Sequence, residues 1–552
     1  MSINLRSLQP DGVTGLLLCL TLSVLFVGGV FGIDFVAGHS VFWRTEMRDV
    51  TQYVAGFNFY FNASWQSPWL SFDALNYPLG TLATFVDAIP IYAFLLKLTV
   101  PSNWGPFNPY GAWVGLCFLL QAVGGWWIAK ELRTKSWVFL VTLVGLLLSF
   151  PALLDRIGHI SLMSHWLLLF ALALYLKTQH QKEWPLKSWA ALCILAFYIN
   201  IYVCVMVCGF FASAWLSAPH QTTIKRVQAI LLPALLLLAT AFFAVWPLPS
   251  GNPTPEFGFG YYSLNLASPW MGGAILPLPT WLGLNPIAGF TYVGEAGQYE
   301  GFNYLGLGVL LLVGVIALPM LKSVKRHKSF FAFMVVLTVY ALSNQVFLGR
   351  HSLVEFQYPE WLLPLTSQFR ASGRFFWVVG YAFTVLSLYK IYQVLKPRQF
   401  AALALVVAVI QLIDLQGVYQ GLSFRLHRED AAVMNTDQWD AALGSEVRVL
   451  YAYPKFKCGK DPQNTLLPLM KYASERQLKL NTGYIARYTP DCLDMKAEVA
   501  LSNPATSAYV LSSGALAAGV SPETIFPSSW SVRCEAIDFA QVCRVTQWPK
   551  TP

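Results

Sequence analysis

Long apolar stretches alternate with short charged segments through the first 420 residues of the chain. A helix needs about 20 mostly apolar residues to cross a bilayer. Stretches of this kind lie near residues 12–33, 110–130, 136–153, 160–177, 187–217, 227–248, 302–322, 328–347, 372–394 and 398–418. The run 187–217 is too long for one straight helix, and we predict two short passes broken near 198–202. The segment 83–99 is a further, shorter candidate. The pattern predicts a mainly α, polytopic transmembrane bundle of roughly 11–13 spans.

Charged loops between these stretches orient the predicted spans. The most basic loops should be cytoplasmic, and they are residues 130–135, 177–187, 224–226, 322–328 and 396–398. The loops 34–82, 249–301 and 343–361 then face outward, together with everything after about residue 420. Residues 83–99 leave an alternative open. If this segment crosses the bilayer, the loop 130–135 lies outside. If it does not, the segment is re-entrant or interfacial.

Composition supports a chain that is solvated mainly by lipid. Of its 552 residues, 56% are hydrophobic and only 12% are charged, about half the charged fraction of soluble domains. The net charge of +9 is explained by basic cytoplasmic loops, so we expect the lipid bilayer and no nucleic acid as a partner. Nucleotide-binding glycine motifs and zinc-ligand spacings do not occur in the sequence.

The last segment, 421–552, differs in composition from the rest. It mixes both signs of charge, contains strand-like alternation in EVRVLYAY (446–453), and carries four cysteines. We predict a small α+β extracytoplasmic domain, after a transmembrane domain of residues 1–420. Cys534 and Cys543 are close enough in sequence for a hairpin-like bridge, which leaves Cys458 with Cys492. Four cysteines allow three connectivities, and an even number suits an oxidising compartment.

Ionisable residues stand directly after the first apolar run, in EMRDVTQY (46–53). The outer loop that contains them is rich in aromatics, which favour the headgroup layer, so we expect it to lie along the leaflet. A carboxylate at this boundary, such as Asp49, can act as a general base toward an acceptor hydroxyl. The alternative interpretation is that Glu46 and Asp49 pair with Arg44 and Arg48 and anchor the helix end.

A second polar group lies between two apolar runs, in PALLDRIGHISLMSHW (151–166). Asp155 and His159 are four residues apart and would share one face of a helix. Arg156 is a permanently charged fork that can bind phosphate. The alternative is a polar turn with a satisfied Asp–His pair.

Two arginines four residues apart precede a predicted span, in SQFRASGRFFW (367–377). Arg370 and Arg374 would lie one helical turn apart and could clamp a phosphate or diphosphate. The alternative is that both side chains merely extend to the membrane surface.

The outer loop 249–301 and the residues just after it contribute further polar candidates. Glu295, Tyr299, Glu300 and Asn303 lie among glycines in GEAGQYEGFNYLGLG (294–308), and glycines allow close backbone approach. These four residues could shape a substrate cleft. The alternative is an ordered surface loop.

The order of several segments resembles the GT-C superfamily of polytopic membrane glycosyltransferases. More closely, the chain resembles an uncharacterised bacterial membrane-protein family of that type. The segments that carry the resemblance are RDVTQYVAGFNFYF (48–61), NYPLGTLATFVDAIPIYAFLLK (76–97), LLDRIGHISLMSHWLLL (153–169), YYSLNLASPW (261–270), GQYEGFNYLGLG (297–308) and FRASGRFFW (369–377). They span most of residues 34–385, and their specificity comes from their order rather than from one signature.

The resemblance implies transfer of a sugar from a polyprenyl-phosphate donor at the outer face of a bacterial inner membrane. The acceptor would be an envelope glycan, lipid or protein, and the C-terminal domain would be periplasmic. By this resemblance, Asp49 matches the catalytic base of the first outer loop and Asp87 is a second acid. Arg370 and Arg374 would bind the donor phosphate. The loop lacks a paired Asp-x-Asp motif, so no cofactor is assigned and a divalent metal is left open.

Two other functional classes remain compatible with the sequence. A transporter or flippase of lipid-linked envelope precursors would use the same arginines to pass phosphate. Such transporters often contain inverted repeats, and none is evident here. A non-catalytic scaffold of envelope assembly would tolerate changes to the acids but not deletion of the tail.

Overall fold

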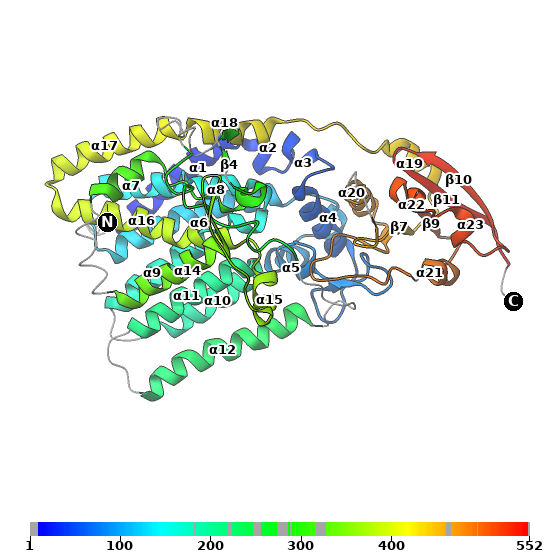
Figure 1. Cartoon of the computed structure of the whole chain (residues 1–552), viewed down its shortest axis with the longest axis horizontal. Coiled ribbons are helices and arrows are strands. Elements are labelled where there is room, and N and C mark those ends of the chain that lie inside the picture. The colour runs from blue at the N-terminus through cyan, green and yellow to red at the C-terminus, as the bar shows by residue number, and fades with distance from the viewer. Residues whose placement is uncertain are drawn as a thin grey trace, which may run out of the picture. The chain divides into compact units, whose positions relative to one another are not determined.

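The computed structural model describes residues 9–180, 184–217, 223–246, 256–272, 285–287, 290–292, 294–315, 327–459, 465–493 and 495–549 (Figure 1). Parts of the predicted loop 249–301, of the predicted span 302–322 and of the basic loops 177–187 and 322–328 lie outside these residues. The chain forms two compact units. Unit 1 comprises Met1–Val36, Gly111–Leu238 and Pro255–His427, and unit 2 comprises Ala37–Tyr110, Ala239–Thr254 and Arg428–Pro552.

Apolar helices dominate unit 1, which confirms the predicted mainly α, polytopic class. Seven helical segments among the described residues are long and apolar enough to cross a membrane. They include or coincide with α1 (Val13–Val30), α6 (Tyr110–Glu131), α7 (Trp137–Leu148), α9 (Trp166–His180), α12 (Thr223–Val245), α16 (Trp377–Val394) and α17 (Pro397–Asp414). Shorter apolar helices include α14 (Lys328–Leu342) in unit 1 and α5 (Pro90–Thr99) in unit 2.

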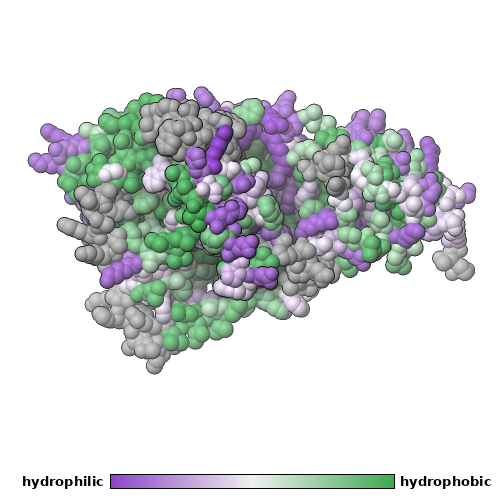
Figure 2. Space-filling model, in the orientation of Figure 1, coloured by the Kyte–Doolittle hydropathy of each residue, from purple (hydrophilic) through white to green (hydrophobic). Residues whose placement is uncertain are grey.

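Leucine and valine side chains are exposed on the outer face of α17, which is green in Figure 2. Exposure of so many neighbouring apolar side chains to water is energetically unfavourable. A face of this kind is therefore suited to contact with lipid. We therefore treat the chain as a multi-pass membrane protein.

The long apolar run 187–217 is broken into two helices, as predicted. Helix α10 spans Leu186–Ile199 and α11 spans Ile201–Ser217, with extended backbone at Asn200 between them. The Asn200 side chain accepts a hydrogen bond from the backbone N–H of Tyr202 at 2.9 Å and donates one to Ser161 at 3.0 Å. The amide thus caps α11, and α11 packs against α9, α10 and α14.

Short irregular segments connect the helices of unit 1 and carry its polar residues. They are α8 (Pro151–Asp155), η4 (Arg156–Gly158), η5 (Ile160–Met163), η7 (Ala296–Gly301), η9 (Ser372–Phe376) and α18 (Gln416–His427). A further connection holds the hairpin β5 (Gln345–Leu348) and β6 (His351–Glu355), followed by η8 (Glu360–Leu362) and α15 (Leu363–Gln368).

Two of these segments, η7 and η9, meet the backbone of Ser263 at two glycines. A Cβ atom on Gly373 would lie 2.5 Å from the Cα of Gly301, and one on Gly301 would lie 2.2 Å from the carbonyl oxygen of Ser263. Only glycine fits both positions. The buried amide of Asn303 donates to the carbonyl oxygens of Gly301 and Gly373, at 3.0 Å each. This arrangement fixes η7 against η9, and with it the residues next to both glycines.

Unit 2 contains a five-stranded sheet in the order β10-β11-β9-β7-β8. Strand β7 (Val449–Tyr453) is parallel to β8 (Lys479–Leu480) and to β9 (Ser507–Ser512). Strands β10 (Ser531–Ile537) and β11 (Ala540–Gln547) extend the sheet in antiparallel fashion. The helices α20 (Leu466–Glu475) and α21 (Met495–Leu501) follow β7 and β8. All residues of β7 are buried, as expected of a central parallel strand covered on both faces.

Residues of the first predicted outer loop extend this sheet beyond β8. Leu75 forms a parallel bridge with Leu480, and the backbone N–H of Leu480 donates to the carbonyl oxygen of Ala74 at 2.8 Å. The N–H of Tyr77 donates back to the carbonyl oxygen of Leu480 at 3.0 Å. Unit 2 is therefore assembled from distant parts of the sequence, and not from the C-terminal segment alone.

Two disulfides lie in unit 2. One joins Cys458 to Cys492 and the other joins Cys534 to Cys543. The second pair faces across β10 and β11, where the two cysteines are partners in the strand register.

Candidate functional site

Asp49 is the first residue of helix α4 (Asp49–Asn62), and its side chain is exposed. Arg48 precedes it in extended conformation, with φ −112° and ψ 161°. A carboxylate in the first turn of a helix interacts favourably with the helix dipole. The fold therefore presents Asp49 to solvent from a well-defined helix start.

Gln52 connects the same helix face to Asp87. Its side-chain amide donates a hydrogen bond to Oδ2 of Asp87 at 2.7 Å, and it lies three residues after Asp49, hence on the same face. Asp87 is exposed and has a left-handed backbone (φ 56°). Helix α4 approaches this turn closely, because a Cβ on Gly56 would lie 2.3 Å from the carbonyl oxygen of Val86. We call Asp49, Gln52 and Asp87 the acid group.

The turn that carries Asp87 is conformationally strained. Two residues further on, Ile89 also has a positive φ of 51°, which is rare for a β-branched side chain. Such backbone is retained only where the surrounding structure fixes it, and it is common at functional sites. Here it sets the direction of the Asp87 side chain toward Gln52.

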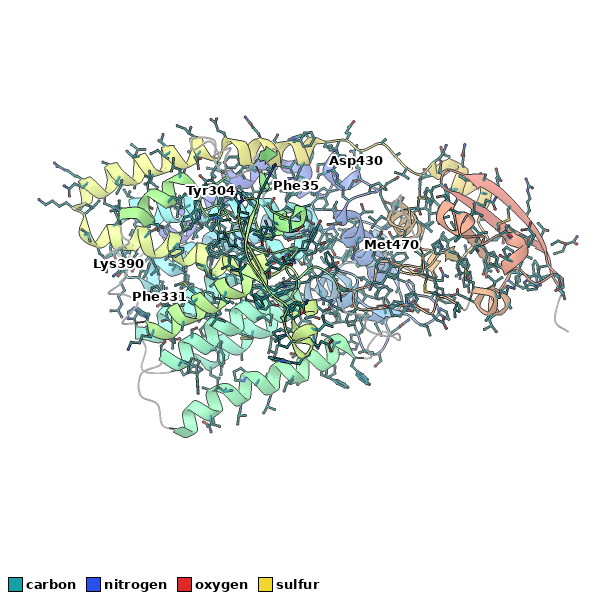
Figure 3. All side chains as sticks on the ribbon, viewed as in Figure 1. Phe35, Tyr304, Phe331, Lys390, Asp430 and Met470 are labelled. Atoms are coloured by element: carbon teal, nitrogen blue, oxygen red, sulfur yellow. A yellow bond between two sulfur atoms is a disulfide. The ribbon has the colours of Figure 1, made fainter. Side chains whose placement is uncertain are left out.

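Glu46 and Arg48 do not join the acid group. Oε2 of Glu46 accepts hydrogen bonds from the backbone N–H groups of Val433 and Met434, at 2.7 and 3.1 Å. Arg48 forms an ion pair with Asp430 at 2.7 Å between Nε and Oδ2, and Asp430 is labelled in Figure 3. These contacts of Glu46 and Arg48 with residues 430–434 help to anchor the start of α4.

A second group of ionisable side chains lies in unit 1 and is centred on Glu300. The carboxylate of Glu300, whose side chain is 4% exposed, forms ion pairs with Arg156, with Nε of Arg374 at 2.9 Å and with Nε2 of His159 at 3.2 Å. Arg156 also pairs with Asp155, which in turn is 3.3 Å from Nη1 of Arg425. We call these six residues the arginine cluster: Asp155, Arg156, His159, Glu300, Arg374 and Arg425.

The arginine cluster has a buried interior and a cationic edge. The side chain of Arg156 is only 3% exposed, whereas those of His159 and Arg425 are 27% and 29% exposed. Three arginines against two carboxylates leave a charge of +1 before His159 is counted. An excess of fixed positive charge at a partly exposed edge is suited to an anionic ligand such as a phosphate.

Burial alone would raise the pKa of Glu300, but the charges of Arg374, Arg156 and His159 hold that pKa well below its usual range. A lowered pKa in the folded state stabilises the protein at every pH above the unfolded value, about 4.3 for glutamate. We therefore expect this contribution to persist at neutral pH. It should be lost as the pH falls below about 4, through the folded pKa of Glu300.

This expectation can be measured by thermal unfolding of the detergent-solubilised protein between pH 7 and pH 3. On acidification, the melting temperature of the wild type should fall further than that of a Glu300→Gln variant. Only the wild type has the Glu300 carboxylate to protonate. An identical acid dependence in both proteins would contradict the assignment.

Arg370 and Arg374 contact different partners. Nη1 of Arg370 donates to the carbonyl oxygen of Phe257 at 2.9 Å, and its Nε lies 3.5 Å from Oε2 of Glu256. The residues around Arg374 form the 3₁₀ turn η9, which has three residues per turn, so a spacing of four does not align two side chains. The structure thus brings Arg374 into the arginine cluster with Arg156 and His159, whereas Arg370 contacts Glu256 and Phe257.

The four residues predicted to shape a cleft have distinct positions. Glu300 is the buried centre of the arginine cluster, and Asn303 ties η7 to η9. Glu295 caps η7 and exchanges hydrogen bonds with Gln298. Tyr299 has an exposed ring, and its carbonyl oxygen accepts a hydrogen bond from Nη2 of Arg156 at 3.2 Å.

One residue of the acid group, Gln52, and one of the arginine cluster, Arg425, were not identified from the sequence. Arg425 comes from α18, beyond the last predicted span, and no local pattern connects it to Asp155. Gln52 could have been found, since its spacing from Asp49 matches one helical turn. Among the described residues, no group of three or more histidine, cysteine, aspartate or glutamate side chains could hold a metal ion.

Family models match most of the chain. Residues 20–416 match the family described as a domain of unknown function (DUF6311), and residues 438–545 match the DUF6311 C-terminal domain. The comparison with curated proteins gives no match.

One solved structure that is similar to the chain is the arabinofuranosyltransferase AftD from Mycobacteria. The identity is 13% and the TM-score is 0.49, over 96% of this chain and 40% of that one. The chain therefore spans well under half the length of that protein. We draw no functional conclusion from a likeness at this level.

Proposed function

Since the chain belongs to the family described as a domain of unknown function (DUF6311), we propose its function from its own residues: it is a membrane glycosyltransferase of the GT-C type. It would transfer a sugar from a polyprenyl-phosphate donor to an acceptor of the cell envelope, at the outer face of the inner membrane. The observation that carries the proposal is the arginine cluster, a preorganised cationic site held in place by a buried carboxylate. The order of sequence segments that resembles the GT-C superfamily supports the same reaction class.

The arginine cluster is proposed to bind the phosphate of the donor. Glu300 holds His159 and Arg374 in place, and Asp155 holds Arg425. Arg156 pairs with both carboxylates. Charges fixed in position before the reaction stabilise the leaving phosphate as its negative charge develops. Arg370, whose side chain is 39% exposed, is proposed as a further phosphate contact, and Tyr299 as a contact of the sugar.

The acid group is proposed to act on the acceptor. Asp49 would accept the proton of an acceptor hydroxyl while its oxygen attacks the anomeric carbon of the sugar. The bond from that carbon to the phosphate oxygen breaks, and the phosphate leaves with the electron pair. A single displacement of this kind inverts the anomeric centre. Gln52 and Asp87 would keep the acceptor hydroxyl oriented, and Glu46 would act indirectly, by anchoring the start of α4.

The two disulfides of unit 2 support the proposed side of the membrane. Disulfides persist in oxidising compartments such as the periplasm and are rare in the cytosol. We therefore propose that the C-terminal domain is periplasmic.

The donor role is tested with an Arg374→Gln variant in lipid nanodiscs. With a panel of polyprenyl-phosphate sugars and native envelope extract as the acceptor source, the wild type should release free polyprenyl phosphate. Loss of a charged hydrogen bond to the leaving phosphate should lower that rate about 10²–10³-fold. Arg350→Gln is the matched control, because Arg350 is an exposed arginine of the same unit, and its activity should be unchanged.

Two results would contradict the proposal. Equal release by wild type and Arg374→Gln would remove the arginine cluster from donor binding. Absence of release by the wild type from every donor of the panel is the result expected of a transporter or a scaffold.

A further inference from the structure

The connection between α14 and η9 exposes an unusual number of apolar side chains. Trp361 is 75% exposed and Leu353 is 54% exposed. Together with Val354, Phe356 and Leu365, which are also exposed, they form what we call the hairpin face. It comprises the strand β6, the turn after it, η8 and the start of α15.

Both faces of strand β6 are exposed in the described part of the chain. Leu353 and Val354 are consecutive, so their side chains point to opposite faces of the strand, and every residue of β6 is exposed. Among the described strands, β6 pairs only with β5. A two-stranded hairpin with apolar residues on both faces is marginal in water, and its free edge invites association. Some apolar environment outside this part of the chain must therefore stabilise it.

Both ends of the connection are fixed by apolar helices. Helix α14 ends at Leu342 and packs against η9 and α16. Its exposed residues Val335, Val336 and Val339 form a face suited to lipid. The connection leaves α14 directly after this face and returns at η9, where the helical segment of α16 begins. The hairpin face is thus continuous in the chain with a helix whose exposed valines are suited to lipid.

Charges and free backbone groups determine how deep the hairpin can lie. Arg350, His351, Glu355 and Glu360 alternate with the apolar side chains, and the outer edge of β6 needs water to satisfy its N–H and C=O groups. Neither is tolerated in the hydrocarbon core. Both are tolerated in the headgroup layer, where tryptophan is also enriched.

We infer that the hairpin face is a membrane-binding surface that lies in the headgroup layer of the bilayer beside α14. Its partner is the lipid surface itself. The hairpin lies flat as a monotopic element, so that its apolar side chains reach the acyl boundary while its charged side chains stay among the headgroups and water. This inference goes beyond the proposed function, since it holds for an enzyme, a transporter or a scaffold, and for either orientation of the chain.

The test places one nitroxide label at a time on the full-length protein in lipid nanodiscs, through Leu353→Cys and Trp361→Cys. Collision of the label with oxygen, which concentrates in lipid, is compared with collision with a water-soluble nickel chelate. Val336→Cys on α14 is the lipid-exposed control. Leu501→Cys on α21, an exposed leucine of unit 2, is the aqueous control. Labelling of the unaltered protein measures the background from its own cysteines.

We expect the oxygen-to-nickel ratio at Leu353→Cys and Trp361→Cys to be higher than at Leu501→Cys and lower than at Val336→Cys. A nickel chelate carried on a lipid headgroup should broaden both hairpin labels strongly. A ratio equal to that of Leu501→Cys overturns the inference, because the face is then in water. Dipolar broadening between labels on separate chains also overturns it, because a second copy then covers the face. The substituted side chains are exposed, so a folding failure is not expected to obscure the result.

Discussion

Replacing Asp49 with Asn is expected to lower the rate of sugar transfer by about 10²–10⁴-fold, the usual contribution of a general base. Asn has the shape of Asp but cannot accept the proton of the acceptor hydroxyl. The Asp49 side chain is exposed at the start of α4, so we expect the variant to fold. Release of polyprenyl phosphate by the purified variant in nanodiscs is the measurement, with the melting temperature recorded on the same sample.

Asp437→Asn is the matched control for this result. Asp437 is also an exposed acid in the first turn of a helix, α19 (Thr436–Leu443). Its loss should reduce the same favourable dipole interaction, roughly 0.3–1 kcal/mol, without any effect on transfer. If Asp49→Asn retained full activity, or if both variants lost activity alike, Asp49 would not be the base.

The apolar pattern predicted the helical class well, because the requirement for about 20 apolar residues per span is local. The break at Asn200 was also predictable, since one polar residue in a 31-residue run can cap a new helix. By contrast, the partners of Glu46 and Arg425 lie more than 250 residues away in sequence. Nothing in a local pattern indicates such pairs. Arg370 and Arg374 do not lie on one α-helix, because α15 ends at Gln368 and the 3₁₀ turn η9 begins at Ser372.

The assembly of unit 2 changes how the C-terminal segment should be interpreted. The backbone of 433–434 holds Glu46, Asp430 holds Arg48, and Leu480 extends the sheet to Leu75. Deleting the tail would therefore remove the supports of the helix that carries Asp49. A loss of function after tail deletion is expected for an enzyme as much as for a scaffold, and only the single-residue variants separate the two.

Replacing Glu300 with Gln is expected to lower the free energy of unfolding by about 3–5 kcal/mol, the cost of removing one partner from a buried ion pair. The variant leaves Arg156, which is 3% exposed, with Asp155 as its remaining carboxylate partner. Arg374 and His159 lose their carboxylate as well. Gln preserves the volume and can still accept a hydrogen bond, so the expected loss comes from charge rather than from packing.

Chemical or thermal unfolding of the protein in detergent at neutral pH measures this effect. Glu535→Gln is the control, because Glu535 is an exposed glutamate on β10 and should change stability by no more than about 0.5 kcal/mol. If Glu300→Gln unfolded like the wild type, the buried carboxylate would not be what fixes the arginine cluster, and its preorganisation for phosphate would need another source.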